Sequence, residues 1–294
     1  MAKPRRIGLA LGGGGARGLA HIHVLSTFDE LGIKPSHIAG SSIGAIFGAA
    51  YASGMSGAEI EDFALASFAS PRLLAGRLWA TRPPTLADFW ADGGFRLGQL
   101  NARRVLGAFL PPAMHIDFDA LEIPTTVMAT DFYARRALAI RTGDLMSALA
   151  ASAALPAVFR PVRRDGLVLV DGGIYNPLPF DQLRDAAEVI VAVDVNGGPE
   201  GDAVRLPTPV EAMIGASQLM QQSIIETKLL IDPPDLLFRP PVSRYGVLDF
   251  LRTKTILDET RGVREEVKGQ LGRLLDRPPV FELDEAIEAL QREV

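Results

Sequence analysis

The sequence predicts an α/β protein in which helices cover both faces of a mostly parallel sheet. Two observations lead to this fold class. Short apolar runs of strand length alternate with longer segments of helical periodicity along most of the chain. Two of the runs also pass through glycine-containing turns straight into a helix, which gives two consecutive strand–turn–helix units.

The first unit begins with the apolar run 7–11, which we interpret as a buried strand. A helix is expected over 16–31, because apolar residues recur there at helical intervals and Gly32 provides a stop. The second unit repeats this order, with a short strand over 36–40 and a helix of small residues over 45–53.

Prolines and glycines interrupt the segment 63–104, which we interpret as an irregular helical excursion. Beyond it, a helix is expected over 143–154 and a mostly helical part over 197–294, with helices at 209–231 and 255–275. Four further strands are expected over 125–130, 137–141, 167–170 and 188–195.

Composition excludes several classes of function. The 294 residues, of which 48% are hydrophobic, suffice for one large domain or two unequal lobes. A formal net charge of −5 offers no basic surplus, so we expect no nucleic-acid partner. The absence of cysteine excludes disulfides, thiolate zinc sites and cysteine nucleophiles, and it suits a reducing compartment.

The sequence favours neither a signal peptide nor a membrane span. The basic N-terminus runs directly into the strand 7–11 and a glycine loop, which is not the pattern of a signal peptide. The uncharged segment 38–58 is long enough to cross a bilayer, but Gly, Ala and Ser dominate it, and we do not favour a span. We expect a cytoplasmic protein, with loose membrane association left open.

The strongest chemical signal is the Gly-x-Ser-x-Gly sequence at 40–44, set between a strand and a helix. A nucleophile elbow needs a glycine on both sides, here Gly40 and Gly44, because the serine occupies a strained turn. The N-terminus of the following helix would stabilise negative charge that develops at Ser42. Taken alone, the pentapeptide is equally compatible with a structural turn.

A second glycine motif, at 12–18, lies between the first strand and the first helix, where backbone N–H groups converge on an anion. A dinucleotide site would need an acidic residue at the end of the second strand, where this chain has 39–42 instead. A Walker-type loop would need Lys-Ser or Lys-Thr after the glycines. An oxyanion hole beside Ser42 is the interpretation that remains.

The base for Ser42 is Asp171 in our interpretation, because a histidine placed late in the chain is lacking. A triad through His115, the last histidine, stays the alternative. Asp171 ends the apolar strand 167–170, and the glycine pair after it lets the chain turn sharply. Asp171 would take the serine proton directly, helped by burial that raises its pKa. The alternative is that Asp171 has only a structural role in the turn that follows the strand.

Together, Gly-Gly-Gly-Ala-Arg-Gly at 13–18, Gly-Ser-Ser-Ile-Gly at 40–44 and Asp-Gly-Gly at 171–173 resemble the patatin-like phospholipase family in its bacterial form. The likeness runs over 7–196. It implies a three-layer α/β/α sandwich around a mostly parallel sheet, formed by a single domain over 1–294.

The resemblance also implies roles for individual residues. Ser42 would be the nucleophile and Asp171 the proton acceptor, with no metal and no cofactor. Gly13, Gly14 and Gly15 would supply the amides of the oxyanion hole. The supporting positions would be Arg17, which braces the loop, and Gly18, Gly40, Gly44, Gly172 and Gly173. The family often has Asp-Gly-Ala where this chain has Asp-Gly-Gly.

We therefore expect a serine acyl hydrolase of lipid esters, of phospholipase A or lysophospholipase type. The alternative is a non-catalytic lipid-binding or regulatory protein with the same fold, and the presence of both catalytic positions favours the enzyme. A nucleotide-binding oxidoreductase ranks below both, for want of the ribose carboxylate. Neither the oligomeric state nor the choice between hydrolysis and acyl transfer follows from the sequence.

The segment 63–90 combines aromatic and leucine residues with arginines, and it has no acidic residue from 63 to 87. Such a segment can lie on a bilayer and admit lipid to the site. An ordinary helix packed on the sheet is the interpretation we favour. The pair His21 and His23 is interpreted as helix packing rather than as a metal site.

Overall fold

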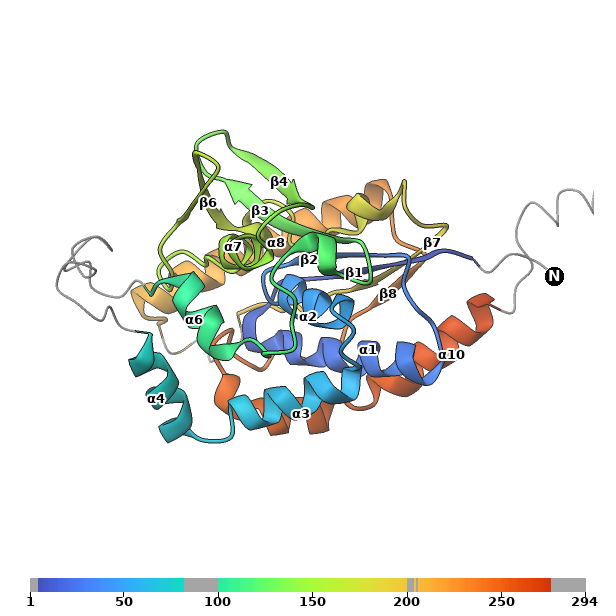
Figure 1. Ribbon diagram of the computed structural model, residues 1–294, viewed down its shortest axis with the longest axis horizontal. Helices are drawn as coiled ribbons and strands as arrows, with labels where there is room; N and C mark the ends of the chain where they lie inside the picture. Colours follow the sequence, from blue (N-terminus) through green and yellow to red (C-terminus); the bar gives the residue numbers. More distant parts are fainter. Residues whose placement is uncertain (1–4, 82–99, 200–203, 205, 276–294) are drawn as a thin grey trace, which may run out of the picture.

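The computed structural model describes residues 5–81, 100–199, 204 and 206–275, and within them an eight-stranded sheet forms the centre of the molecule (Figure 1). The strands are Ile7–Leu11 (β1), His37–Ser41 (β2), Thr125–Asp131 (β3), Arg136–Ile140 (β4), Val162–Arg164 (β5), Leu167–Asp171 (β6), Val189–Val193 (β7) and Leu236–Phe238 (β8). Their order is β5-β6-β3-β2-β1-β7-β8, and β4 pairs with β3 outside this path.

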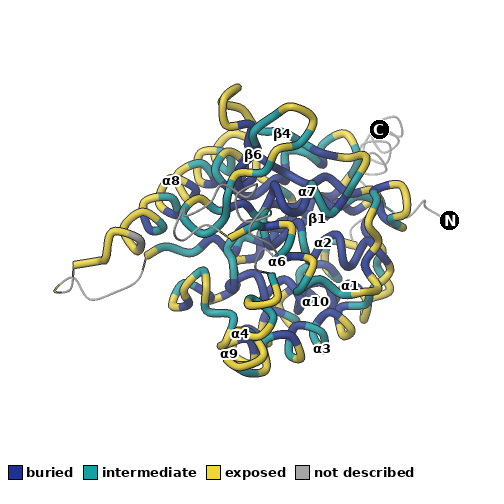
Figure 2. The backbone as a smooth tube through the Cα atoms, turned by 60° about the vertical axis from the view of Figure 1, so that its left-hand side comes forward, coloured by how far each residue is buried: buried dark blue, intermediate teal, exposed yellow. Residues whose placement is uncertain are grey.

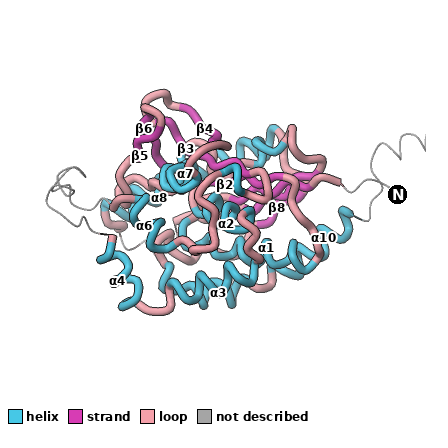
Figure 3. The backbone as a smooth tube through the Cα atoms, in the orientation of Figure 1, coloured by secondary structure: helices cyan, strands magenta, loops and turns pink. Residues whose placement is uncertain are grey.

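Pairing is parallel from β3 through β2, β1 and β7 to β8, and antiparallel where β3 meets β4 and β6 and where β6 meets β5. The predicted mixed α/β fold with a mostly parallel sheet is therefore confirmed. Figure 3 shows β2 and β8 among the helices and β4, β5 and β6 at the upper edge of the molecule.

The helices lie on both faces of the sheet. They are His21–Glu30 (α1), Ile43–Ala52 (α2), Gly57–Ser67 (α3), Pro71–Ala80 (α4), Ala102–Phe109 (α6), Leu145–Ser152 (α7), Pro209–Ile231 (α8), Thr253–Thr260 (α9) and Val263–Leu275 (α10). In Figure 1, α1, α3 and α10 lie together below the sheet, and α8 lies on the opposite side.

The two faces of the sheet carry different side chains because successive residues of a strand point in opposite directions. Leu9 and Leu11 of β1 join the larger apolar cluster, on the side of α1 and α2. Ala10 joins a smaller cluster on the other face, together with Phe180 and Ile225 of α8. Figure 2 shows β1, α2 and α7 in the buried centre of the molecule.

One strand, β3, brings two others end to end. Residues 127–131 of β3 pair with β4 along one edge, so β2 and β6, which pair with 125–128 and 129–131, share the opposite edge. β2 runs parallel to β3 and β6 runs antiparallel to it. The two strands therefore approach each other along β3, and their carboxyl ends meet.

The described elements differ from the predicted ones in several places. The helix expected over 16–31 begins with a 3-10 helix, Gly15–Ala20, and becomes α-helical only at His21. The helix expected over 255–275 is two helices, α9 and α10, which end and begin on either side of Gly262, a residue with poor helix propensity. The three-residue strands β5 and β8 were not predicted.

The segment 38–58, considered above as a membrane span, is divided among β2, α2 and the start of α3. Across the described ranges, we find no helix that has both the length and the apolar character required to span a bilayer.

Candidate active site

Ser42 occupies the sharp turn between β2 and α2. Its backbone has a φ of 52° and a ψ of −121°, and residues other than glycine rarely adopt a positive φ. The N–H of Ser42 donates a hydrogen bond of 2.8 Å to Oγ of Ser152, the last residue of α7. The turn is thus held from a second element, with the serine at the N-terminus of α2.

The structure brings Ser42 and Asp171 into direct contact. Ser42 Oγ donates a hydrogen bond of 2.6 Å to Asp171 Oδ2. The other carboxylate oxygen, Oδ1, accepts a hydrogen bond of 2.7 Å from the backbone N–H of Gly173. Asp171 is 3% exposed, and this burial raises its pKa to about 6, against the opposing effect of the two hydrogen bonds.

The glycine loop lies beside Ser42 and lines the same cavity. A Cβ added to Gly13 would lie 3.5 Å from the Cβ of Ser42, so the loop passes at van der Waals distance from the serine. The N–H of Gly13 donates to the carbonyl oxygen of Pro177 at 3.0 Å. In the part of the chain that the structure describes, the N–H groups of Gly14 and Gly15 donate to no other group. These two amides are available to an oxyanion.

Arg17 of the glycine loop is buried, and its guanidinium group bonds to carbonyl oxygens of two other segments. Its Nε donates to the carbonyl oxygen of Tyr245 at 2.5 Å, and its Nη1 donates to that of Asn196. Its Nη2 donates to the carbonyl oxygens of Gly198 at 3.1 Å and Ser243 at 3.2 Å. One guanidinium group thereby joins the glycine loop to the segments 196–198 and 243–245.

The supporting glycines lie at points where two segments touch. At Gly44, a Cβ would overlap the carbonyl oxygen of Leu11, so α2 can lie this close to β1 only without a side chain there. At Gly172, a Cβ would overlap the carbonyl oxygen of Met128. The same kind of overlap, with Ile43 and Ala45 respectively, would occur at Gly18 and Gly40.

A cavity of about 390 Å³ opens at Ser42 and Asp171. Its walls are mainly apolar side chains from α2, α3, α4 and α6: Ile43, Ile46, Phe47, Ala50, Ile60, Phe63, Ala64, Leu74, Leu78, Val105, Leu106 and Phe109. Among the described lining residues, Asp171 is the single ionisable one. The cavity is within the size range of small-molecule sites and suits an apolar chain.

Polar side chains of α8, which the sequence analysis did not single out, line the cavity as well. Gln218 and Gln221 are 6% and 8% exposed. Gln221 donates to Oγ of Ser217 at 3.2 Å, and its amide would lie 3.5 Å from a Cβ added to Gly173. The available signal was a group of uncharged polar residues in an otherwise apolar stretch of helix, namely Ser217, Gln218, Gln221 and Gln222.

The histidines do not take part in this arrangement. Within the described residues, none of the four lines the cavity. His115, the alternative triad member, is exposed and uses its backbone N–H to donate to Ser53 Oγ. A triad through His115 is therefore wrong. His21 is buried in α1, where its Nε2 bonds the carbonyl oxygen of Gly12, and burial lowers its pKa to about 4.

The segment 63–90 was expected to be a helix packed on the sheet, and for α4 this is wrong, because α4 has no buried residue. Leu74 and Leu78 face the cavity, whereas Trp79 is 66% exposed. One side of α4 thus faces the cavity and the other faces solvent, so α4 does not pack on the sheet. Residues 82–90, including Phe89 and Trp90, lie outside the described residues.

The sheet, the serine turn and the adjoining aspartate define an α/β protein of the patatin-like class. The family model described as patatin-like phospholipase matches residues 9–184, and the chain belongs to this family.

Relatives extend the comparison. An uncharacterized NTE family protein of Mycobacterium tuberculosis is 36% identical over 200 residues, which cover 67% of this chain and 51% of that protein. Patatin-like phospholipase domain-containing protein 6 of Homo sapiens is 31% identical over 199 residues, or 67% and 14% of the two chains. Lysophospholipase NTE1 of Coccidioides immitis is 27% identical over 271 residues, or 84% and 16%. The match thus spans about half of the mycobacterial relative and less of the others.

Among solved structures, VipD from Legionella pneumophila aligns with a TM-score of 0.46 at 14% identity, over 90% of this chain and 67% of that one.

Proposed function

We propose that this protein is a serine acyl hydrolase of lipid esters, of phospholipase A or lysophospholipase type. Ser42 is the nucleophile and Asp171 its base. The observation that carries the proposal is the 2.6 Å hydrogen bond from Ser42 Oγ to a buried carboxylate, both of which line an apolar cavity. Membership of the patatin-like phospholipase family and the lysophospholipase name of a relative support a lipid ester as substrate.

In the first half of the reaction, Ser42 Oγ attacks the ester carbonyl carbon while its proton passes to Asp171 Oδ2. The N–H groups of Gly14 and Gly15 and the N-terminus of α2 stabilise the oxyanion of the tetrahedral intermediate. When the intermediate collapses, the ester C–O bond breaks and the alcohol leaves with the proton from Asp171. An acyl-Ser42 remains.

In the second half, water attacks the acyl carbonyl and gives a proton to Asp171. Collapse of the second intermediate releases the fatty acid, and the proton returns to Ser42 Oγ. One carboxyl group thus acts as base and acid in turn, a task for which a pKa of about 6 is better suited than the usual aspartate value.

The lining of the cavity suits the two halves of an ester. The apolar walls of α2, α3 and α6 accommodate the acyl chain, and the amide of Gln221, which lies near Gly173, is available to the alcohol portion. Residues of α8 and of 247–250 line the same cavity as the three motifs, which supports a single functional domain that includes the C-terminal part.

We also propose that α4 makes peripheral contact with a lipid surface. Leu73 and Trp79 are exposed beside a helix face that lines the cavity, and the helix carries Arg72 and Arg77 but no acidic residue. Exposed apolar side chains near the exposed Arg72 suit an anionic bilayer, whereas Arg77 donates to Ser67 and Ala108 within the protein.

The decisive experiment is reaction of the purified protein with a fluorophosphonate probe, followed by mass spectrometry. Labelling at Ser42 that Ser42→Ala abolishes and Asp171→Asn slows at least about 100-fold would support the proposal. A well-folded wild-type protein that neither labels nor hydrolyses lipid esters would overturn it and favour a lipid-binding protein. Product analysis in the presence of alcohols separates hydrolysis from acyl transfer.

A further inference from the structure

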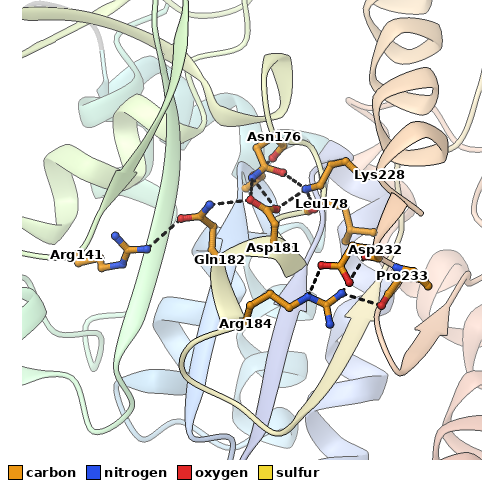
Figure 4. Close-up of polar contacts among 10 residues, drawn as sticks. Arg141, Asn176, Leu178, Asp181, Gln182, Arg184, Lys228, Asp232 and Pro233 are labelled. Atoms are coloured by element: carbon orange, nitrogen blue, oxygen red, sulfur yellow. Dashed lines mark hydrogen bonds and ion pairs between the residues drawn. The ribbon is translucent and has the colours of Figure 1, made fainter. Parts of the chain in front are cut away.

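A cluster of polar residues lies outside the cavity, between α8 and the segment that follows Asp171 (Figure 4). At its centre, Lys228 Nζ donates to Asn176 Oδ1 at 2.6 Å and to the carbonyl oxygen of Leu178 at 2.7 Å, and it forms an ion pair with Asp181. Asn176 Nδ2 donates in turn to both carboxylate oxygens of Asp181, at 3.0 and 3.2 Å. None of these four residues lines the cavity described above.

The main chain of Asn176 and Pro177 connects all three motif segments. The N–H of Asn176 donates to the carbonyl oxygen of Gly172 at 2.9 Å, next to Asp171. The carbonyl oxygen of Asn176 accepts a 2.5 Å hydrogen bond from Ser41 Oγ, one residue before the nucleophile. The carbonyl oxygen of Pro177 accepts the N–H of Gly13 at 3.0 Å.

These contacts make Asn176–Pro177 the place where the relative positions of the nucleophile, its base and the glycine loop are set. The side chain of Asn176 is 5% exposed, and its two ends are held only by the ion pair that Lys228 makes with Asp181, so far as the described residues show. An amide held at both ends cannot rotate, and it fixes the backbone that carries it.

We infer that Lys228, together with Asp181, is a positioning group for the proposed active site and acts through Asn176 and Pro177. The inference rests on the proposed function of Ser42. An ammonium group suits this place because its three N–H donors meet three oxygens, on Asn176, Leu178 and Asp181. Without Nζ, the carbonyl end of the Asn176 side chain and the Asp181 carboxylate both lose a partner in a partly buried place.

Arg184, which is also drawn in Figure 4, provides a matched control for Lys228. Arg184 Nε lies 2.8 Å from Asp232 Oδ2, and its Nη2 donates to the carbonyl oxygen of Pro233 at 2.7 Å (Figure 4). This pair joins the same stretch of chain to the C-terminal end of α8, as the Lys228 pair does. Among the described residues, it forms no hydrogen bond or ion pair with Asn176 or Pro177.

The test compares Lys228→Met with Arg184→Met on a short-chain p-nitrophenyl ester, together with the rate of fluorophosphonate labelling. In Lys228→Met, kcat and the labelling rate fall about 10- to 100-fold with KM within about twofold, because small displacements of reacting groups lower turnover without removing binding contacts. Arg184→Met leaves all three within about twofold. Lys228→Arg keeps the charge and several donors, so its decrease in log kcat is at most two thirds of the decrease in Lys228→Met.

Equal kcat in Lys228→Met and wild type, or equal losses in Lys228→Met and Arg184→Met, would overturn the inference while leaving the proposed function intact. A wild-type protein without turnover or labelling would overturn the proposed function instead. If Lys228→Met does not fold, Asp181→Asn provides the same comparison, since it removes the charge that holds Lys228 but keeps the shape. Its kcat then falls at least about fivefold, and an unchanged kcat would again overturn the inference.

Discussion

Ser41 and Asp171 end their strands on the same edge of β3, where they lie opposite the neighbouring residues Met128 and Ala129. Because β2 and β6 run toward each other along this edge, the serine that follows Ser41 reaches the carboxylate directly, at 2.6 Å. A slip of one residue in the pairing of β6 would move Asp171 by about 3.3 Å and break the contact. The geometry of the proposed dyad is thus a property of sheet register.

The first prediction concerns the pH dependence of catalysis. The base must be ionised, and burial raises the pKa of Asp171 to about 6, so kcat/KM rises with pH up to about 6 and levels off above it. Below the midpoint the slope is about tenfold per pH unit. Initial rates between pH 4.5 and 8.5 test this, with the rate of fluorophosphonate labelling as a second measure. A flat profile across pH 5 to 7 would contradict the role of Asp171.

The second prediction concerns stability. The folded pKa of Asp171 is raised from 3.8 to about 6, so its ionised form destabilises the folded state above pH 6, and this cost disappears as pH falls below 3.8. A shift of about two pKa units corresponds to about 3 kcal/mol. We expect Asp171→Asn to unfold at higher urea than wild type at pH 8, with the difference shrinking toward pH 4. A lower urea midpoint for Asp171→Asn at pH 8 would show that the ionised carboxylate is stabilising.

The third prediction concerns acyl-chain selectivity. Ala64 of α3 lines the cavity, and Ala64→Phe should shorten the space for the chain. We expect kcat/KM for a palmitoyl ester to fall at least about tenfold, while that for a butyryl ester stays within about threefold. Ala66, on the exposed side of the same helix, provides the control Ala66→Phe. Equal effects on both esters would place the acyl chain elsewhere.

The fourth prediction concerns the close approach of α2 to β1. In Gly44→Ala, the new methyl group overlaps the carbonyl oxygen of Leu11, and the free energy of unfolding should fall by about 2 kcal/mol or more. Gly107 of α6 has no atom near the position of a Cβ in the described structure. Gly107→Ala should therefore raise stability by up to about 1 kcal/mol. Urea unfolding of both variants tests the contrast, and a stable Gly44→Ala would refute the packing argument.

The fifth prediction concerns the lipid surface. We expect Trp79→Ser to reduce co-sedimentation with anionic liposomes at least about fivefold, because an exposed aromatic side chain contributes to interfacial binding. Tyr133 is 75% exposed in the turn after β3, and Tyr133→Ser serves as the control. Unchanged binding of Trp79→Ser would remove the proposed contact of α4 with membranes.

Much of the fold could be predicted because its signals are local. The apolar runs 7–11 and 167–170 and the glycines that follow them predict strands and turns from neighbouring residues alone. The strands β5 and β8 have three residues each, which is too short for a periodicity to show. Their formation depends on the partners β6 and β7, which lie elsewhere in the sequence.

The hydrogen bonds of the candidate site could not be predicted from the sequence. Sequence motifs point to Ser42 and Asp171, yet the contact between them depends on how β2 and β6 share β3. Likewise, Gly13, Gly14 and Gly15 were expected to supply amides to the oxyanion hole. The N–H of Gly13, however, already donates to the carbonyl oxygen of Pro177, which lies far away in the sequence. Such partners are set by tertiary structure, as are the glutamines that α8 contributes.

The shared edge of β3 also has a consequence for biosynthesis. During translation, the serine turn emerges long before Asp171, and Lys228 follows later still. A chain released early would carry Ser42 without Asp171. Pairing between such distant segments is also slow compared with helix formation. On the proposed function, ester hydrolysis therefore becomes possible only near the end of folding, when Ser42 and Asp171 have been brought together.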